Sequence, residues 1–441
     1  MPDTNLRNLT LEEAVKAAEA EHTRANPQSA TRFEEACRAM PGGNTRTVLH
    51  YSPFPLTIAR AEGSRLEDID GHRYTDYLGE YTAGLYGHSH PVIMKAIREA
   101  LEGGISFGAP NRWEAALAQL MCERFPSLDL VRFTNSGTES NMMAVVSARA
   151  ATGREKVMVF NGGYHGGVLS FAGGGSPINA PFAFVLATYN DLEGTRTLIE
   201  QNATALAAVL IEPMMGGGGG IAARPEFLRM LRETTEKHGI VLIFDEVMTS
   251  RLSAGGLQAR LGIVPDLTTF GKYLGGGMSF GAFGGREDLL ARFDPRRPDA
   301  WSHAGTFNNN VLSMAAGIAG LTQLFTPEAA ERLNASGDLL RQRLNEAGRK
   351  AGVPLQCSGI GSIMAIHWQS RAVERPSDTA DTPAGARTLF HLGMLQRGFY
   401  LARRGFISLS LVLDERDHER FVAAVEDYLE TTRPVLQATL S

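Results

Sequence analysis

A lysine and a carboxylate, each placed directly after a short apolar segment, are the residues with the clearest catalytic potential. Ile240–Phe244 (IVLIF) runs into Asp245, and Leu267–Phe270 runs into Gly271 and Lys272. Ligands of doubly wound α/β sheets bind beyond the carboxyl ends of the strands, so both side chains are predicted to reach one site. A lysine amine can form an imine, and a carboxylate can keep a pyridine nitrogen protonated. The pair therefore indicates pyridoxal 5'-phosphate (PLP) chemistry, although Asp245 alone could equally cap the segment that follows it.

A third segment predicts where an anionic group would bind. Asn135–Ser140 (NSGTES) follows the apolar stretch Leu130–Phe133 and opens a predicted helix. Ser136, Gly137 and Thr138 would then lie at the helix N-terminus, where free N–H groups and the helix dipole favour a phosphate. A simple Ser or Asn cap is the alternative interpretation of the same residues.

A glycine-rich segment supplies a ring close to the same sheet edge. Gly162–Gly167 (GGYHGG) follows the strand-like Val157–Phe160 and contains Tyr164 and His165. A ring in such a loop can stack on a flat heterocycle, and it can equally pack in the core.

Apolar segments that alternate with helices predict an α/β fold around these residues. Between about residues 90 and 325, four near-continuous apolar runs have the length of strands. Such runs are typical of a mostly parallel sheet that helices cover on both faces. The runs are Val157–Phe160, Ala207–Ile211, Val241–Phe244 and Leu267–Phe270. One crossover helix is predicted between Pro225, in its first turn, and Gly239, after its end.

The two ends of the chain are predicted to form a smaller α+β domain. Because 441 residues exceed the usual length of one domain, we expect an N-terminal segment of the small domain at 1–75, a large PLP-binding domain at 76–326 and a C-terminal small domain at 327–441. The polar stretch Ala372–Pro383 is predicted to be a mobile loop. The elements expected in the ends are helices at Leu11–Ala25, Ala30–Met40, Ala329–Ala351 and Asp417–Leu429, and β-like stretches at Leu56–Leu66 and Arg73–Leu78.

Composition and charge exclude several classes of protein. The formal net charge of −5 argues against a nucleic-acid-binding protein, which needs a clustered basic surface. Cys37, Cys122 and Cys357 form no CxxC pattern, and the alternating His88 and His90 are expected to be structural rather than metal ligands. No apolar export segment opens the chain, and no apolar run approaches the roughly 20 residues that cross a bilayer. We therefore expect a cytoplasmic protein without a metal site.

The order of six motifs resembles the class III, fold-type I PLP-dependent aminotransferases. The resemblance extends from about Ala36 to the C-terminus, and the motifs are specific as an ordered set. They are NSGTE, YHGG, IEP (Ile211–Pro213), FDEV (Phe244–Val247), TTFGK (Thr268–Lys272) and HAGTF (His303–Phe307). The resemblance implies a homodimer with its two PLP sites at the subunit interface.

The same resemblance implies a role for each motif residue. Lys272 would form the Schiff base and act as the general acid–base, while Asp245 would pair with the pyridinium nitrogen. Tyr164 would stack on the ring, and Thr306 would reach the phosphate of the cofactor in the partner subunit. The other residues assigned to the cofactor are Ser136, Gly137 and Thr138, which would hold the phosphate, and Glu212.

Two arginines are candidates for binding the substrate. Arg46 lies in Pro41–Leu56 (PGGNTRTVLHYSPFPL), and Arg404 lies in Ala402–Phe406 (ARRGF). An arginine presents a planar, permanently charged fork that matches a carboxylate, although most charged residues are simply surface residues. Within class III, the chain resembles the aromatic β-amino-acid (β-phenylalanine) aminotransferases. The similar stretches are PGGNTRTVLHYSPFPLTIARAEG, EYTAGLYGHS, which contains Tyr81, FDEVMTSRL, GKYLGGGMSFGAFGG and HAGTFNNNV.

That closer resemblance implies the substrates. Arg46 would receive the carboxylate of a β-amino acid, Arg404 the α-carboxylate of a keto acid, and Tyr81 would contact the substrate. A β-amino acid carries its carboxylate one carbon further from the reacting carbon, so one fixed fork cannot suit both substrates. The expected reaction moves an amino group from an aromatic β-amino acid, such as β-phenylalanine, to 2-oxoglutarate or pyruvate by a ping-pong mechanism.

The main alternative is glutamate-1-semialdehyde 2,1-aminomutase, which forms 5-aminolevulinate. Ser106–Pro110 (SFGAP), RFTNSGTES and DLTTFGK resemble that enzyme too. Its pattern near Thr306 usually continues GTLSGNP, whereas this chain has GTFNNNV. A PLP-binding regulator without turnover would normally carry a DNA-binding module, and none is visible. PLP racemases and decarboxylases of similar fold are lesser alternatives.

Overall fold

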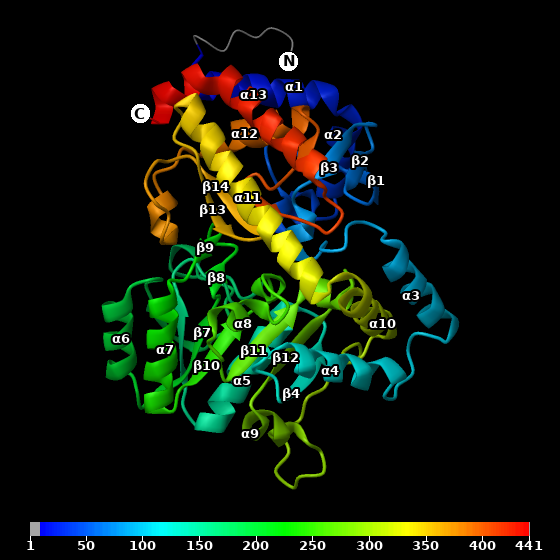
Figure 1. The fold of residues 1–441 in the computed structure, drawn as a ribbon, viewed down its shortest axis with the longest axis vertical. Helices are drawn as coiled ribbons and strands as arrows, with labels where there is room; N and C mark the ends of the chain where they lie inside the picture. Colours follow the sequence, from blue (N-terminus) through cyan, green and yellow to red (C-terminus); the bar gives the residue numbers. More distant parts are fainter. Residues whose placement is uncertain (1–8, 441) are drawn as a thin grey trace.

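A seven-stranded sheet forms the core of the lower half of the molecule, as drawn in Figure 1. The computed structural model describes residues 9–440. The strand order is β4-β12-β11-β10-β7-β5-β6, and β12 runs antiparallel to both of its neighbours while the pairs from β11 to β6 are parallel. The strands are β4 (Leu130–Thr134), β5 (Lys156–Phe160), β6 (Ala183–Ala187), β7 (Leu206–Ile211), β10 (Val241–Asp245), β11 (Leu267–Gly271) and β12 (Gly281–Gly285). The predicted mostly parallel sheet is confirmed.

Helices cover both faces of this sheet, because successive residues of a strand point to opposite sides. Leu242 and Phe244 of β10 pack in one apolar cluster with Leu228 of α7. Val241 and Ile243, the intervening residues, pack in another cluster with the apolar side of α5. Every residue of β7, β10 and β11 is buried, which explains why these strands have near-continuous apolar sequences. The helices of this half are α3 (Pro91–Glu102), α4 (Arg112–Arg124), α5 (Gly137–Thr152), α6 (Leu192–Gln201), α7 (Pro225–His238), α8 (Gly256–Leu261), α9 (Glu287–Leu290) and α10 (Val311–Ala319).

Local sequence signals set the ends of the crossover helix α7. Pro225 is its first residue, and Gly239 follows its last turn with a left-handed φ of 60°. Proline is pre-organised for the first helical position, and glycine adopts the left-handed cap without a steric penalty. The predicted helix is therefore confirmed at both ends.

The upper half of the molecule brings the two ends of the chain together (Figure 1). In its four-stranded sheet, of order β1-β2-β3-β15, Phe399 pairs with Thr75 and Tyr400 with Asp76. A three-stranded sheet has the order β13-β14-β16. The strands are β1 (Ile58–Glu62), β2 (Arg65–Asp68), β3 (Arg73–Asp76), β13 (Gln356–Ile360), β14 (Ile363–His367), β15 (Phe399–Tyr400) and β16 (Phe406–Ser408), and the helices are α1 (Leu11–Ala25), α2 (Pro27–Cys37), α11 (Pro327–Ala351), α12 (Ala384–Gln396) and α13 (Glu415–Leu440). The division at 1–75, 76–326 and 327–441 stays our proposal.

Several predicted elements differ from the structure at their boundaries, and three of these differences have a clear local cause. The β-like stretch Leu56–Leu66 is two strands, β1 and β2, because Gly63 turns the chain with a φ of 56°. The second helix spans Pro27–Cys37 rather than Ala30–Met40, and it begins earlier because proline suits its first position. The last helix continues to Leu440 rather than ending at Leu429, because apolar residues beyond that point remain buried. Within residues 9–440, no helix is long and apolar enough to cross a membrane.

Candidate active site

The carboxyl ends of β10 and β11 bring Asp245 and Lys272 to one edge of the sheet. Asp245 ends β10 and lies opposite Thr269 of the parallel strand β11. Lys272 follows β11 directly and has a left-handed φ of 58°. Residues other than glycine seldom adopt this conformation, and they keep it mainly where the surroundings enforce it, as at functional sites. Both residues lie where the sequence pattern predicted.

Three hydrogen bonds fix the Asp245 carboxylate, which is almost wholly buried. His165 Nδ1 lies 2.8 Å from Oδ2, and Asn141 Nδ2 donates to the same oxygen at 2.9 Å. Oδ1 accepts the backbone N–H of Val247 at 3.0 Å, which ties the carboxylate to the turn after β10. Asp245 does not cap the next helical segment, whose N-cap is Met248. Asn141 is itself held by the Thr269 hydroxyl, which donates to Asn141 Oδ1 at 2.7 Å. The carboxylate is therefore rigidly placed on hydrogen-bond donors, without a lysine or arginine partner at salt-bridge distance within residues 9–440.

Burial and the charges of four other residues act on the amine of Lys272. Burial lowers the pKa of Lys272 to about 8, and the negative charges of Glu80 and Asp245 oppose this shift. The positive charges of Arg46 and Arg404 lower the same pKa further. A lysine with a pKa near 8 is partly neutral at physiological pH, so it can act as a nucleophile or a base.

The predicted phosphate site lies at the start of α5. Ser136 caps the helix through its hydroxyl, which accepts the N–H of Glu139 at 3.2 Å. The first backbone N–H groups of any helix have no carbonyl partner in a preceding turn, so those at Gly137 and Thr138 can bind an anion. The cap and the anion site use different donors. Both interpretations of the sequence are therefore compatible with this geometry.

The loop that carries Tyr164 is tied to α5. Gly167 N–H donates to the Thr138 hydroxyl at 3.3 Å. A Cβ atom on Gly166, whose φ is 125°, would come within 2.3 Å of that hydroxyl oxygen. Only glycine permits this approach. The side chain of Tyr164 remains about half exposed, so its ring has a free face.

Glu212 holds the backbone beneath Tyr164. Its carboxylate accepts the N–H of Tyr164 at 2.9 Å and the N–H of Gly216 at 3.0 Å. Burial raises the pKa of Glu212 to about 7, although the neighbouring His165 acts in the opposite direction and Asp245 adds to the rise. Glu212 therefore contributes to the site by holding the loop that carries Tyr164 in place.

The two candidate arginines reach the site in different surroundings. Arg46 Nη1 lies 2.6 Å from Glu80 Oε1, and both side chains are about half exposed. The guanidinium of Arg404 lies 5.2 Å above the ring of Tyr81 and 5.4 Å from the ring of Phe406. Burial lowers the pKa of Arg404, and within residues 9–440 its guanidinium has no carboxylate at salt-bridge distance. One arginine is thus paired, and the other is left free for an anion.

Thr306 lies in an exposed loop next to the start of α5. Asn135 Nδ2 donates to Asn308 Oδ1 at 3.0 Å, which joins the two loops. Thr306 is exposed, and Phe307 and Phe107 close by present exposed rings. A hollow of about 360 Å³ is lined by residues of both the 105–111 and the 305–311 segments.

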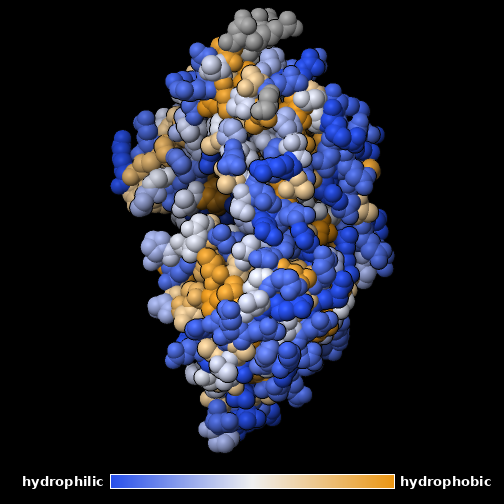
Figure 2. Space-filling view, turned by 90° about the vertical axis from the view of Figure 1, so that its left-hand side faces the viewer, coloured by the Kyte–Doolittle hydropathy of each residue, from blue (hydrophilic) through white to orange (hydrophobic). Residues whose placement is uncertain are grey.

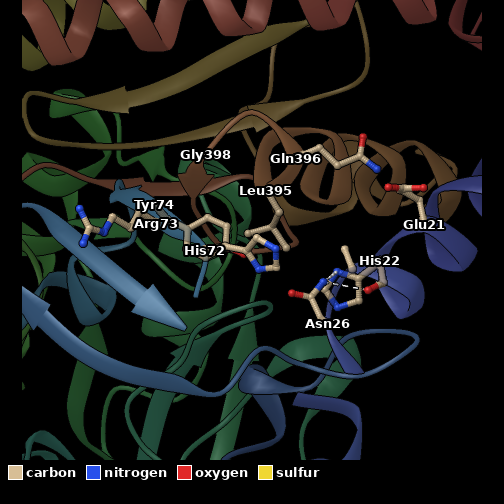
Figure 3. A pocket seen from close by; sticks show the side chains of 10 residues that line it. Glu21, His22, Asn26, His72, Arg73, Tyr74, Leu395, Gln396 and Gly398 are labelled. Carbon is tan, nitrogen blue, oxygen red and sulfur yellow. Dashed lines mark hydrogen bonds between the residues drawn. The ribbon is translucent and has the colours of Figure 1, made fainter. Parts of the chain in front are cut away.

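Figure 2 shows a hollow in the surface between the upper and lower halves of the molecule, with apolar side chains in its wall. A separate hollow of about 390 Å³ lies in the upper half and is lined by His22, Asn26, His72 and Tyr74 (Figure 3). None of the residues predicted from the sequence for the active site lines that second hollow. The predicted residues gather instead at the carboxyl edge of the large sheet and in the loops above it.

The chain matches the model of the class-III aminotransferases over residues 48–400, and it belongs to that family. It is 51% identical over 424 residues to the β-phenylalanine transaminase of Variovorax paradoxus, a match that covers 96% of this chain and 98% of that protein. The crystal structure of a β-phenylalanine aminotransferase from Variovorax paradoxus has a TM-score of 0.96 at 50% identity, covering 97% of this chain and 99% of that one.

Less similar relatives include proteins named for each of the two reactions considered from the sequence. Glutamate-1-semialdehyde 2,1-aminomutase of Desulforudis audaxviator is 37% identical over 425 residues, covering 92% of this chain and 98% of that protein. A solved transaminase with PLP bound is 32% identical with a TM-score of 0.86, covering 93% of this chain and 99% of that one. The predicted family, fold type and cofactor are confirmed: the protein is a PLP-dependent transaminase of fold type I.

Several residues of this site were not assigned by sequence reasoning. Asn141 and Glu80 were missed, and His165 was considered as a ring but not as the partner of Asp245. Asn141 follows Thr138 by three positions, so helical spacing places both on one face of α5, and this signal could have found it. Glu80 has no comparable signal, because 34 residues separate it from Arg46 in the chain.

Proposed function

We propose that this transaminase moves an amino group from a β-amino acid, aromatic as in β-phenylalanine, to 2-oxoglutarate or pyruvate in a ping-pong reaction. The observation that carries the proposal is the convergence of two arginines from separate loops on the turn at Glu80 and Tyr81, one paired with Glu80 and the other free above Tyr81. Two forks at different positions suit two substrates whose carboxylates lie at different distances from the reacting carbon. The 51% identity to a β-phenylalanine transaminase supports the same substrate class.

Each residue then has a defined task in the reaction. PLP, when bound, accepts the electron pair that proton removal leaves on the substrate carbon. Lys272, in its neutral form, removes that proton and later returns one, while Asp245 keeps the pyridine nitrogen protonated. The start of α5, at Ser136, Gly137 and Thr138, holds the phosphate, and Tyr164 lies against the ring. Arg46 orients the β-amino acid, Arg404 orients the keto acid, and Tyr81 contacts either substrate.

The enzyme is further proposed to be a homodimer, in which Thr306 reaches the phosphate in the partner subunit. The exposed rings of Phe107 and Phe307 next to Thr306 favour this arrangement, since exposed apolar clusters mark protein interfaces. A cytoplasmic location stays a prediction, favoured by the free thiols of Cys37, Cys122 and Cys357.

A half-reaction tests the proposal directly. The PLP-loaded enzyme is mixed with β-phenylalanine or with glutamate, without a keto acid, and the absorbance of the lysine-bound cofactor is followed. Loss of that band with β-phenylalanine supports the proposal. Loss of the band with glutamate but not with β-phenylalanine would contradict the assignment of the donor.

Glutamate-1-semialdehyde 2,1-aminomutase is the second candidate, because 37% identity to such an enzyme extends over 92% of this chain. It is distinguished by its product: 5-aminolevulinate would form from glutamate-1-semialdehyde without any added keto acid. The same incubation with β-phenylalanine and 2-oxoglutarate supplies the comparison.

A further inference from the structure

The Glu80 carboxylate is paired with the guanidinium of Arg46, which is the group proposed to bind the substrate carboxylate. Arg46 Nη1 and Glu80 Oε1 lie 2.6 Å apart, within the range of a strong charge-assisted hydrogen bond. Their side chains are 46% and 50% exposed, so solvent and a small anion can reach the pair. A carboxylate that binds Arg46 through the same fork must therefore compete with Glu80.

The position of Glu80 is built into a constrained turn. The four consecutive residues Gly79–Thr82 have positive φ angles of 52°, 45°, 52° and 84°. The Asp76 carboxylate fixes the start of the turn, since its Oδ1 accepts the N–H of Leu78 at 2.8 Å and that of Gly79 at 3.0 Å. Four consecutive residues with positive φ persist only when their surroundings enforce them. The turn therefore fixes the backbone position from which the Glu80 side chain reaches Arg46.

The opposite side of the turn is closed by packing. A Cβ atom on Gly79 would lie 2.9 Å from the backbone oxygen of Ser408, so the turn lies close against β16. The ring of Tyr81 stacks on Phe406 with 5.9 Å between centroids. The backbone of Glu80 cannot move away easily, whereas its side chain can rotate.

Glu80 also lies within electrostatic reach of the reactive amine. The negative charges of Glu80 and Asp245 both oppose the lowering of the Lys272 pKa that burial causes. The Glu80 carboxylate is paired with Arg46 and also acts electrostatically on Lys272. A hollow of about 500 Å³, which both Arg46 and Glu80 line, leaves room for the Glu80 side chain to turn aside.

We propose that Glu80 is a specificity-determining residue that occupies the carboxylate site of Arg46 in the resting enzyme and leaves it when a β-amino acid binds. This inference rests on the proposed function of Arg46. When a keto acid binds through Arg404, the Glu80–Arg46 pair is retained and keeps Arg46 neutralised. The site thereby alternates between two states. Arg46 is free of Glu80 when the donor binds, and it is paired with Glu80 when the acceptor binds.

The expected change in carboxylate affinity follows from the exposure of the Arg46–Glu80 ion pair. An exposed ion pair contributes little, so releasing Arg46 should tighten carboxylate binding by about twofold to fivefold. A suitable probe is 3-phenylpropanoate, which has the carbon skeleton and carboxylate of β-phenylalanine but no amine to react. The matched uncharged probe is 3-phenylpropanamide.

Calorimetric titration of the PLP-loaded enzyme with both probes tests the proposal without requiring turnover. Glu80→Gln removes the charge, and Glu80→Asp keeps it on a side chain one methylene shorter. Both variants are expected to bind 3-phenylpropanoate about twofold to fivefold more tightly and to leave the amide unaffected. Glu415→Gln is the matched control, because Glu415 is also 50% exposed and paired with an arginine, Arg343.

The possible outcomes separate the inference from the function on which it rests. Tighter binding of the propanoate alone in both Glu80 variants supports displacement of Glu80. If Glu80→Gln binds more tightly while Glu80→Asp matches the unmodified enzyme, the charge acts at a distance and displacement is wrong. If Arg46→Ala weakens the propanoate but neither Glu80 variant tightens it, only this inference is overturned. If Arg46→Ala leaves the propanoate unaffected, the proposed role of Arg46 is overturned, and this inference with it.

Discussion

His165 Nδ1 lies 2.8 Å from Asp245 Oδ2, and both side chains are almost wholly buried. An ionised carboxylate can only accept hydrogen bonds, so the proton between them belongs to the imidazole Nδ1. Asn141 Nδ2 supplies a second donor to the same oxygen. Together the two donors orient the carboxylate at the strand end, in the way that outer residues orient the groups of a reactive site.

The first prediction concerns the reactive amine. Lys272→Ala should abolish the absorbance band of the lysine-bound cofactor and reduce turnover by several orders of magnitude, because no nucleophile or base remains. Borohydride reduction followed by peptide mapping checks the assignment. Cofactor trapped on another lysine of the variant would show that Lys272 is not the attachment site.

The second prediction concerns the charge beneath the ring. Asp245→Asn should retain the lysine-bound cofactor but slow proton removal by about a hundredfold, because a neutral amide no longer favours the protonated pyridine nitrogen. Stopped-flow absorbance of the donor half-reaction at saturating PLP measures this step. A rate close to that of the unmodified enzyme would rule out the proposed role.

The third prediction follows from the His165–Asp245 contact. His165→Phe keeps a ring in the buried space but removes the donor, so the donor half-reaction should slow by roughly tenfold, as expected for a lost hydrogen bond to a charged group. His165→Gln, which keeps an N–H donor, is the control and should retain more activity. Equal rates in the two variants would mean that His165 acts only by packing.

The fourth prediction concerns pH. Because burial lowers the pKa of Lys272 to about 8, its amine is protonated and unreactive below that pH and neutral above it. The rate at which the cofactor-free enzyme captures PLP should therefore rise with pH up to about 8 and level off above it. An ordinary lysine, with a pKa of about 10.4, would give a rate that still rises tenfold per unit at pH 9. That second profile would contradict the lowered pKa.

The sequence predicted the parallel strands and the crossover helix because their signals are local. The apolar runs of β7 and β10 and the Pro225 and Gly239 that bound α7 each show their structure within a few residues. Strand β12 was not predicted, since its sequence GAFGG contains no apolar run. A Cβ atom on Gly281 would lie 2.3 Å from the Ser136 backbone oxygen, so this glycine is required by a distant packing contact that no short pattern indicates.

The residues of the candidate site likewise differ in whether a local sequence signal predicts their position. Asp245 ends β10, Lys272 follows β11 and the Ser136–Thr138 segment comes soon after β4, so strand prediction was enough to bring them to one edge. The roles assigned to Arg46 and Arg404 came from family resemblance, because loops carry no periodicity that fixes where their side chains point. Glu80 could not be predicted at all, since its place depends on a turn of positive φ angles held by Asp76.

The last prediction separates the two arginines by half-reaction. Arg46→Ala should weaken the β-amino acid chiefly, and Arg404→Ala should weaken the keto acid chiefly. A charged carboxylate contact contributes about 1.5–3 kcal/mol, which corresponds to a roughly tenfold to hundredfold loss of affinity. Arg46 is expected at the lower end of this range, because binding there displaces Glu80, whereas Arg404 has no acidic partner to displace within residues 9–440.

The two half-reactions must be measured separately for this prediction, because a steady-state ping-pong assay mixes them. Single-turnover absorbance gives the concentration of β-phenylalanine for half-maximal conversion of the PLP form, and then that of pyruvate for its regeneration. Arg343→Ala is the matched control, since Arg343 is also a partly exposed arginine paired with a glutamate. If both active-site variants impaired both half-reactions equally, the division of carboxylates would be wrong, because one shared anion site would then serve the two substrates.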